Sequence, residues 1–205
     1  DANLPAVAIL LDCRGTAGSE EGFEECVSIA GSIMRFAVEQ GFTGELALSD
    51  GDGYVWELGS SEASAGSLDF LAGVQRHKDG GLEFGIQRLL MAQPGRLAIA
   101  VLNSSQSGEV GQVAGLSRRY SGVVAIEISG RDTEFRLARG VSRLRVRDCA
   151  AFAELWNSGV ASQAAELAAK EAAELAAKEA AELAAKEAAE LAAKEAAELA
   201  AKQAA

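Results

Sequence analysis

A carboxylate directly after an apolar run begins the segment of this chain with the clearest chemical meaning. The segment LLDCRGTAG, residues 10 to 18, passes from apolar side chains into Asp12 and then into a loop of small residues. A D-x-S-x-S loop begins in this way, and its carboxylate and hydroxyl oxygens suit a hard divalent cation. Thr16 keeps the second hydroxyl, but Arg14 replaces the first serine. Arg14 lies two residues from Asp12, so the two share a face if the strand extends that far. The guanidinium would then neutralise the carboxylate in place of an ion.

The other side chains with reactive groups lack the partners that catalysis needs. Cys13 would require a nearby base or a helix terminus to become a nucleophile. The only histidine, His77, lies far along the sequence, and no G-x-S-x-G segment occurs. We therefore expect Cys13 to be a small buried thiol and His77 to be a solvated side chain. Residues 50–53 read Asp-Gly-Asp-Gly, lack the further acids of a calcium loop, and indicate a hairpin turn instead.

The composition disfavours several classes of ligand. The chain has 205 residues and a formal net charge of −11, and it contains neither G-x-G-x-x-G nor G-x-x-x-x-G-K-[ST]. We therefore expect no nucleic-acid partner, no bound nucleotide and no other cofactor. One basic cluster occurs, which fits either a solvated sheet edge or a surface for an acidic partner: Arg136, Arg139, Arg143, Arg145 and Arg147.

The cysteines and the hydropathy pattern bear on the compartment. Three cysteines without C-x-x-C spacing are typical of free thiols in a reducing compartment, so we expect a cytoplasmic protein. No apolar run approaches the roughly 20 residues of a membrane-spanning helix, and no signal-peptide pattern is present. The chain begins at Asp1 without Met, from which we expect that the sequence has been trimmed.

Strand-like and helix-like patterns alternate along residues 1–162. Continuous apolar runs predict buried strands, and apolar side chains three or four residues apart predict helices. We expect strands at 5–14, 96–105 and 122–129, a hairpin formed by 44–50 and 53–59, and an edge strand at 142–149. We expect helices at 21–41, 67–78, 82–93, 108–120 and from 150 onward. This order predicts an α/β fold with a doubly wound, mostly parallel, Rossmann-like sheet. Right-handed crossovers then place the loops after residues 5–14 and 96–105 beside each other, at the edge where ligands usually bind.

Residues 163–205 form a second unit of different composition. They repeat AAELAAKE without error, using only Ala, Glu, Leu, Lys and Gln, which indicates a designed segment. All of these residues favour helix, and each Glu four residues before a Lys adds support. The leucines recur every eight residues and therefore circle the helix, so we expect no self-association through a coiled coil. No turn signal separates this repeat from the preceding helix, which predicts one long, rigid C-terminal helix from about Ala150 to the end.

The order of four segments resembles a von Willebrand factor A-like domain over about residues 5 to 160. These segments are LLDCRGT, FEECVSIAGSIMRFAVEQGF, GGLEFGIQRLL and LAIAVLNSS. The second segment is most similar to the bacterial family called domain of unknown function 58. The resemblance implies a protein-interaction role, often alongside a MoxR-type AAA+ ATPase. It also implies a membrane anchor in an N-terminal part outside the present sequence.

The family's metal-binding pattern carries over to this sequence only in part. Asp12 matches the family acid and Thr16 the second hydroxyl, whereas Leu82 stands where a threonine ligand is expected. Asn103 or Ser104 stands where the second aspartate is expected. We therefore predict a degenerate, metal-free loop in a non-enzymatic interaction module. Two alternatives remain open: an enzyme that uses Asp12 and Thr16, and an assembly component in which the domain is only cargo.

Overall fold

The computed structural model describes residues 6–56, 61–78, 81–92, 95–103, 109–129, 134–138, 141–158 and 186. The chain divides into two compact units, Asp1–Ala169 and Lys170–Ala205. Of the second unit only Lys186 is described, and it is helical. The continuous helix predicted beyond residue 158 and the boundary predicted at residue 162 therefore fall outside the described residues.

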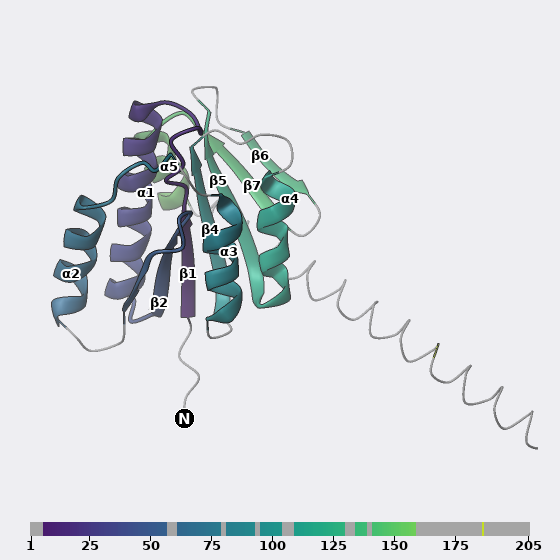
Figure 1. Cartoon of the computed structure of the whole chain (residues 1–205), viewed down its shortest axis with the longest axis horizontal. Helices are drawn as coiled ribbons and strands as arrows, with labels where there is room; N and C mark the ends of the chain where they lie inside the picture. The colour runs from purple at the N-terminus through teal and green to yellow at the C-terminus, as the bar shows by residue number, and fades with distance from the viewer. Residues whose placement is uncertain are drawn as a thin grey trace, which may run out of the picture. The chain divides into compact units, whose positions relative to one another are not determined.

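A mixed sheet of seven described strands forms the centre of the first unit (Figure 1). The strand order is β3-β2-β1-β4-β5-β7-β6. Strands β1, β2, β4, β5 and β7 run parallel, whereas β3 and β6 are antiparallel to their neighbours. The bounds are β1 Ala6–Leu11, β2 Thr43–Leu48, β3 Gly53–Trp56, β4 Gly95–Asn103, β5 Tyr120–Ile128, β6 Glu134–Ala138 and β7 Val141–Val146. The predicted α/β fold with a mostly parallel sheet is confirmed.

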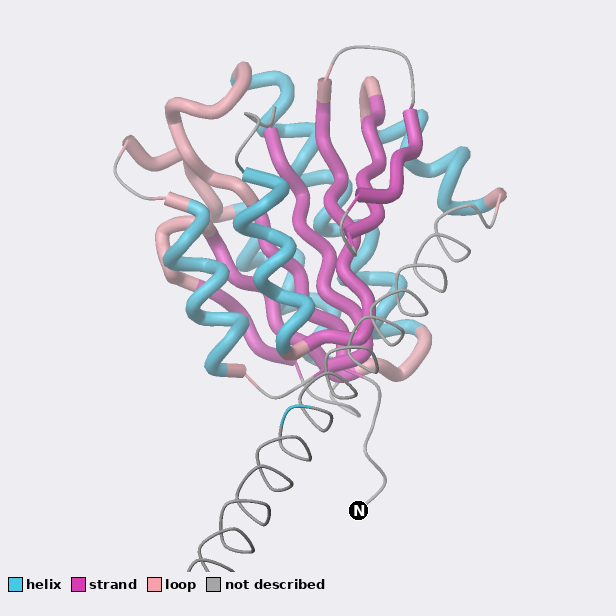
Figure 2. The backbone as a smooth tube through the Cα atoms, turned by 90° about the vertical axis from the view of Figure 1, so that its right-hand side faces the viewer, coloured by secondary structure: helices cyan, strands magenta, loops and turns pink. Residues whose placement is uncertain are grey.

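Helices cover both faces of the sheet, which Figure 2 shows from the side. Helices α1 Glu20–Glu39, α2 Ser61–Ala72 and α5 Cys149–Asn157 pack on one face. Helices α3 Leu82–Met91 and α4 Glu109–Val113, with the 3-10 turn Ala114–Arg118, pack on the other. Side chains alternate between the two faces of a strand. In β1, Ile9 and Leu11 accordingly enter the core under α1, while Leu10 enters the core under α3.

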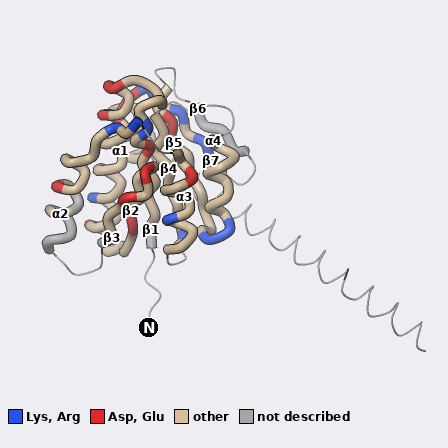
Figure 3. The backbone as a smooth tube through the Cα atoms, viewed as in Figure 1, with Lys and Arg blue, Asp and Glu red and all other residues tan. Residues whose placement is uncertain are grey.

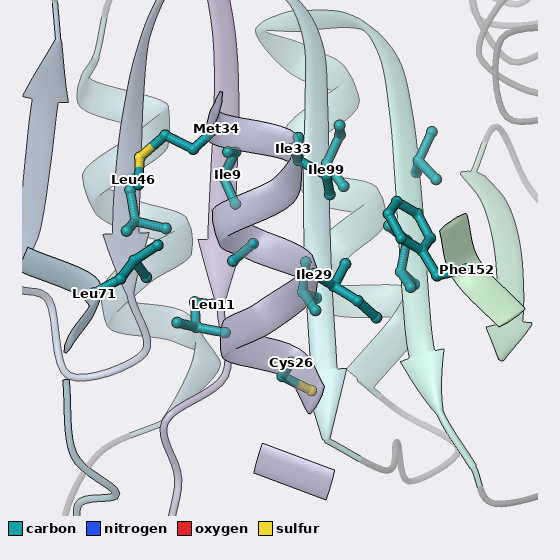
Figure 4. Close-up of a cluster of buried hydrophobic side chains, with 14 of the residues drawn as sticks. Ile9, Leu11, Cys26, Ile29, Ile33, Met34, Leu46, Leu71, Ile99 and Phe152 are labelled. Carbon is teal, nitrogen blue, oxygen red and sulfur yellow. The ribbon is translucent and has the colours of Figure 1, made fainter. Parts of the chain in front are cut away.

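Helix α1 follows the site segment and anchors it to the sheet. Ser19 caps its first turn, accepting a hydrogen bond from the backbone N–H of Gly22 at 3.0 Å. Its apolar face, including Ile29 and Ile33, is buried against the strands (Figure 4). Full burial of one such side chain contributes about 1.5–3 kcal/mol. The helix therefore holds the end of the loop at residues 12–19 in a fixed position.

Three details differ from the sequence-based expectations. The helix predicted at 67–78 begins earlier, at Ser61, and ends at Ala72, so residues 73–78 are not helical. The helix predicted at 108–120 is α4 followed by a 3-10 turn, in keeping with its glycines. The strand predicted at the edge, 142–149, is the inner strand β7, because β6 pairs beyond it. Strand β6 was not predicted, although its antiparallel partner β7 is the next strand in the chain.

Candidate interaction site at the carboxyl edge of the sheet

The direction of the chain connections reverses between β1 and β4. The two strands are parallel neighbours, but α1 follows β1 on one face and α4 follows β4 on the other. Such a reversal separates the two connecting segments and forms the usual ligand crevice of an open α/β sheet. The backbone N–H of Asp12 donates to the carbonyl of Val101 at 3.0 Å, so the pairing of the two strands continues to the start of the loop.

Asp12 and Arg14 form a bidentate ion pair at the carboxyl edge of the sheet. The Nε of Arg14 lies 2.8 Å from Oδ1 of Asp12, and its Nη2 lies 2.8 Å from Oδ2. The backbone N–H of Arg14 also donates to Oδ1, at 3.1 Å. Asp12 is 1% exposed, so its carboxylate depends on these donors and not on water. The hydrogen bonds to Asp12 raise the pKa of Arg14 above its ordinary value.

Arg14 also connects the end of β1 to the start of helix α4. Its Nη1 lies 2.5 Å from Oε1 of Glu109, the first residue of α4. One guanidinium therefore holds a carboxylate from the end of β1 and a carboxylate from the segment after β4. The sequence pattern predicted the first contact, because it is local. Glu109 lies 95 residues away from Arg14, and no local pattern indicated it.

The oxygen atoms at this position suit a divalent cation poorly. Both carboxylate oxygens of Asp12 already accept hydrogen bonds from Arg14. The Leu82 side chain offers no oxygen and is 1% exposed, within the core beneath α3. Mg²⁺ requires several oxygen ligands in near-octahedral geometry. Within the described ranges, no three His, Cys, Asp or Glu side chains are grouped so that they could hold a metal ion.

Asn103 attaches the end of β4 to the loop after β1. Its amide nitrogen donates to the backbone carbonyl of Ala17 at 3.0 Å and of Ser19 at 2.8 Å. The side-chain oxygen occupies the space where a β-carbon of Gly18 or Gly22 would lie. Gly18 also has a φ of +55°, which glycine adopts without strain. Asn103 is thus a buried framework residue, as is Asp12. Of the other candidate loop residues, Thr16 is exposed and Ser104 lies outside the described residues.

The segment after α2 lies directly against the loop, which the sequence did not predict. The backbone N–H of His77 donates to the carbonyl of Cys13 at 2.8 Å, and the N–H of Gly15 donates to the carbonyl of His77 at 2.6 Å. The His77 side chain is partly exposed, and its Nε2 lies 3.0 Å from Oδ2 of Asp50. His77 therefore contacts the site through its backbone, whereas its ring contacts the turn between β2 and β3.

Cys13 is a buried thiol, as predicted. Its backbone N–H donates to the hydroxyl of Ser49 at 2.8 Å, and the residue has no solvent-exposed surface. Burial, followed by the negative charge of Asp50, raises the pKa of the Cys13 thiol to about 12. The neutral thiol therefore dominates at physiological pH, and it is a weak nucleophile.

The described members of the predicted basic cluster lie on β6 (Arg136), on β7 (Arg143 and Arg145) and directly after β7 (Arg147), whereas Arg139 lies outside the described residues. The Nε atoms of Arg143 and Arg145 lie 2.9 and 3.1 Å from Oε2 of the buried Glu127 on β5. Arg147 contacts Asp148 at 2.9 Å. These contacts show that the cluster is compensated in part by acids of the same domain. Figure 3 shows positive and negative positions close together at the carboxyl end of the central strands.

Comparisons with known proteins place the fold. No protein-family model matches the sequence, and no curated protein matches it significantly. The structure of BatB from Bacteroides thetaiotaomicron is similar, with a TM-score of 0.50 at 14% identity, over 81% of this chain and 99% of that chain. A von Willebrand factor type A protein from Catenulispora acidiphila gives a TM-score of 0.48 at 11% identity, over 82% of this chain. The von Willebrand factor A domain of SpRpn10 gives 0.47 at 14% identity, over 70% of this chain and 88% of that one.

The similarity to the BatB structure is consistent with an α/β fold whose central sheet is mostly parallel. At such low identity, the likeness extends to the fold and no further. The chain spans 42% of the length of the Catenulispora acidiphila protein. None of the described helices is both long enough and apolar enough to cross a membrane.

Proposed function

We propose that the von Willebrand factor A-like domain is a non-enzymatic protein-interaction module whose Asp12 loop works without a metal ion. The ion pair between Asp12 and Arg14 is the observation that carries this proposal. The resemblance of the sequence motifs to a von Willebrand factor A-like domain implies a protein-interaction role. Here the carboxylate that would ligate an ion is compensated by a guanidinium of the same loop. A hydrolytic role for Asp12 is disfavoured, because both of its carboxylate oxygens already accept hydrogen bonds from Arg14 and the residue is buried.

The segment FEECVSIAGSIMRFAVEQGF supports a closer relationship with the bacterial domain of unknown function 58 family. From that resemblance we extend the proposal to one partner class, a MoxR-type AAA+ ATPase. The error-free octad in residues 163–205 supports a further part of the proposal, namely that an engineered helical spacer has been joined to the domain. The spacer would present the domain to whatever the helix was built to join.

Calorimetric titration with Mg²⁺ and Mn²⁺ tests the metal-independent loop directly. The chain should show no binding tighter than about 0.1 mM, roughly −5.5 kcal/mol on the affinity scale. The matched variant Arg14→Ser restores a hydroxyl and removes the guanidinium, and circular dichroism would check that it stays folded. Tighter binding by the unmodified chain would contradict the proposal that the Asp12 loop works without a metal ion.

Binding to a purified MoxR-type ATPase tests the interaction role. We would immobilise the domain and treat it with 5 mM EDTA in one experiment and with Mg²⁺ in the other. After exchange into the same buffer, biolayer interferometry would measure the affinity of the ATPase for each preparation. The affinity should be equal under both conditions, because no ion completes the loop. Binding that disappears after EDTA treatment of the domain would overturn the mechanism. No binding to any such ATPase would remove this partner class.

A further inference from the structure

The guanidinium of Arg76 lies inside the curve of the loop between β1 and α1. Its Nη2 lies 2.7 Å from the carbonyl oxygen of Ala17, 2.9 Å from that of Gly15 and 3.2 Å from that of Gly18. The carbonyl oxygen of Arg14 lies at 3.5 Å from the same atom. Four backbone carbonyls of one loop thus point toward one nitrogen.

This arrangement is more than a set of ordinary hydrogen bonds. An Nη nitrogen carries two hydrogens, so it cannot donate separately to four carbonyls. The shared attraction is that of a positive charge for converging dipoles, which is how oxygen atoms surround a cation. Converging carbonyls without a positive charge between them would repel one another. The loop conformation therefore depends on a charge at this position.

Two further contacts set the position of Arg76. Its Nη1 lies 3.1 Å from Oε2 of Glu20 in the first turn of α1, so the same group reaches both the loop and the helix that follows. Its Nε is buried and has no hydrogen-bond partner among the described residues. A buried donor without a partner destabilises the folded state. Attraction to the carbonyls must offset this cost, because no contact of Nε itself holds the side chain there.

We infer that Arg76 is the positioning residue of the interaction loop, holding its carbonyls by charge from a segment about 60 residues away. Its relevance to partner binding rests on the proposed function, but the ordering of the loop does not. Two guanidinium groups then supply the positive charge that one bound ion would supply. Arg14 neutralises the Asp12 carboxylate, and the guanidinium of Arg76 attracts the backbone carbonyl oxygens of the loop.

The backbone contacts of His77 make the inference testable without unfolding the domain. They hold Cys13 and Gly15 whether or not the Arg76 side chain is present. Removing that side chain should therefore loosen residues 16–19 and spare the core strands. A residue that merely stabilised the fold would instead affect both regions equally.

Amide hydrogen exchange on the full chain, followed by NMR, provides the test. Arg76→Ala and Arg76→Gln should raise exchange of the Ala17 amide, which donates to the carbonyl of Arg14 at 3.2 Å, by about tenfold or more, while the amides of Ile9 and Ile99 keep their rates. Arg76→Lys, which keeps the charge, should restore part of the protection. Guanidinium ion at millimolar, non-denaturing concentration should slow exchange in Arg76→Ala and leave the unmodified chain unchanged. Arg35→Ala, which removes an exposed ion pair on α1, serves as the control.

Three outcomes would overturn the inference. These are unchanged exchange in Arg76→Ala, equal acceleration of loop and core amides, and protection by Gln as strong as by Lys. None of the measurements uses a metal or a partner. Failure here is therefore distinguishable from failure of the proposed function, which the titration and the ATPase binding decide.

Discussion

Arg14 spans both carboxylate oxygens of Asp12, with two nitrogen–oxygen distances of 2.8 Å, while the Asp12 side chain is fully buried. A buried carboxylate in this state depends on its partner, because water cannot solvate it. The same guanidinium also reaches Glu109, so its removal would take a positive charge away from two acids.

Removal of one partner should therefore cost more than removal of both. We expect Arg14→Leu to lower the free energy of unfolding by about 3 kcal/mol, since it leaves an unpaired buried charge. The double variant Asp12→Asn, Arg14→Leu should recover a substantial part of that loss. Urea denaturation monitored by tryptophan fluorescence measures each value. Single and double variants that lose equal stability would show that the pair is not coupled.

Gly22 and Gly111 form a matched pair of helical glycines with opposite expected effects. A β-carbon at Gly22 in α1 would overlap the side-chain oxygen of Asn103, whereas one at Gly111 in α4 meets no described heavy atom within 4 Å. Gly22→Ala should destabilise the fold by about 1–3 kcal/mol through overpacking. Gly111→Ala should stabilise it by up to about 1 kcal/mol through helix propensity. Thermal melts compare the two, and a stabilising Gly22→Ala would mean that Asn103 does not fill that space.

The three thiols should react in an order set by burial. Cys13 and Cys26 are buried, and burial is the main cause of their raised pKa values, whereas Cys149 is partly exposed. Iodoacetamide at pH 8 should modify Cys149 first in the native chain, and mass spectrometry of peptides would identify the sites. In urea all three should react at similar rates. Faster native labelling of Cys13 would contradict its assignment as an inert thiol.

The raised pKa of Cys13 also predicts how stability depends on pH. The thiol has a pKa of about 12 in the folded state against 9.0 for the ordinary group. Between these values the unfolded chain releases a proton that the folded chain keeps. The contribution of Cys13 to the free energy of unfolding should therefore be fully present below pH 9 and decrease as the pH rises toward 12. Cys13→Ala should show a smaller decline over the same range, and an equal decline would assign the effect to other groups.

The octad repeat should leave the oligomeric state unchanged. Leu167, Leu175 and the later leucines advance by roughly 80° around a helix at each repeat, so they form no apolar stripe for a second copy. Sedimentation equilibrium of the full chain and of a form ending at Gln163 should give the same state. An oligomer found only with the repeat present would contradict this prediction.

Residues close together in the sequence account for what could be predicted. Apolar runs such as residues 97–102 are buried wherever a strand lies between two layers of helices, so their composition was sufficient. Asp12 and Arg14 are two residues apart, and their approach needs only a continued strand at that point. The burial of Cys13 follows from the same local pattern, because the residue continues the face of β1 that bears Ile9 and Leu11.

Only the tertiary structure decided the contacts that complete the site. Arg76 looked like one polar residue in a predicted helix, yet the chain leaves the helix at Ala72 and carries its guanidinium into the loop after β1. Glu109 and Asn103 reach that loop because β4 lies beside β1 in the sheet. Strand β6 is a different case, because it pairs with the next strand of the chain, β7, and a local hairpin pattern could have revealed it. Local side-chain pattern sets which segments become strands or helices, whereas the order of strands in the sheet determines which distant side chains meet.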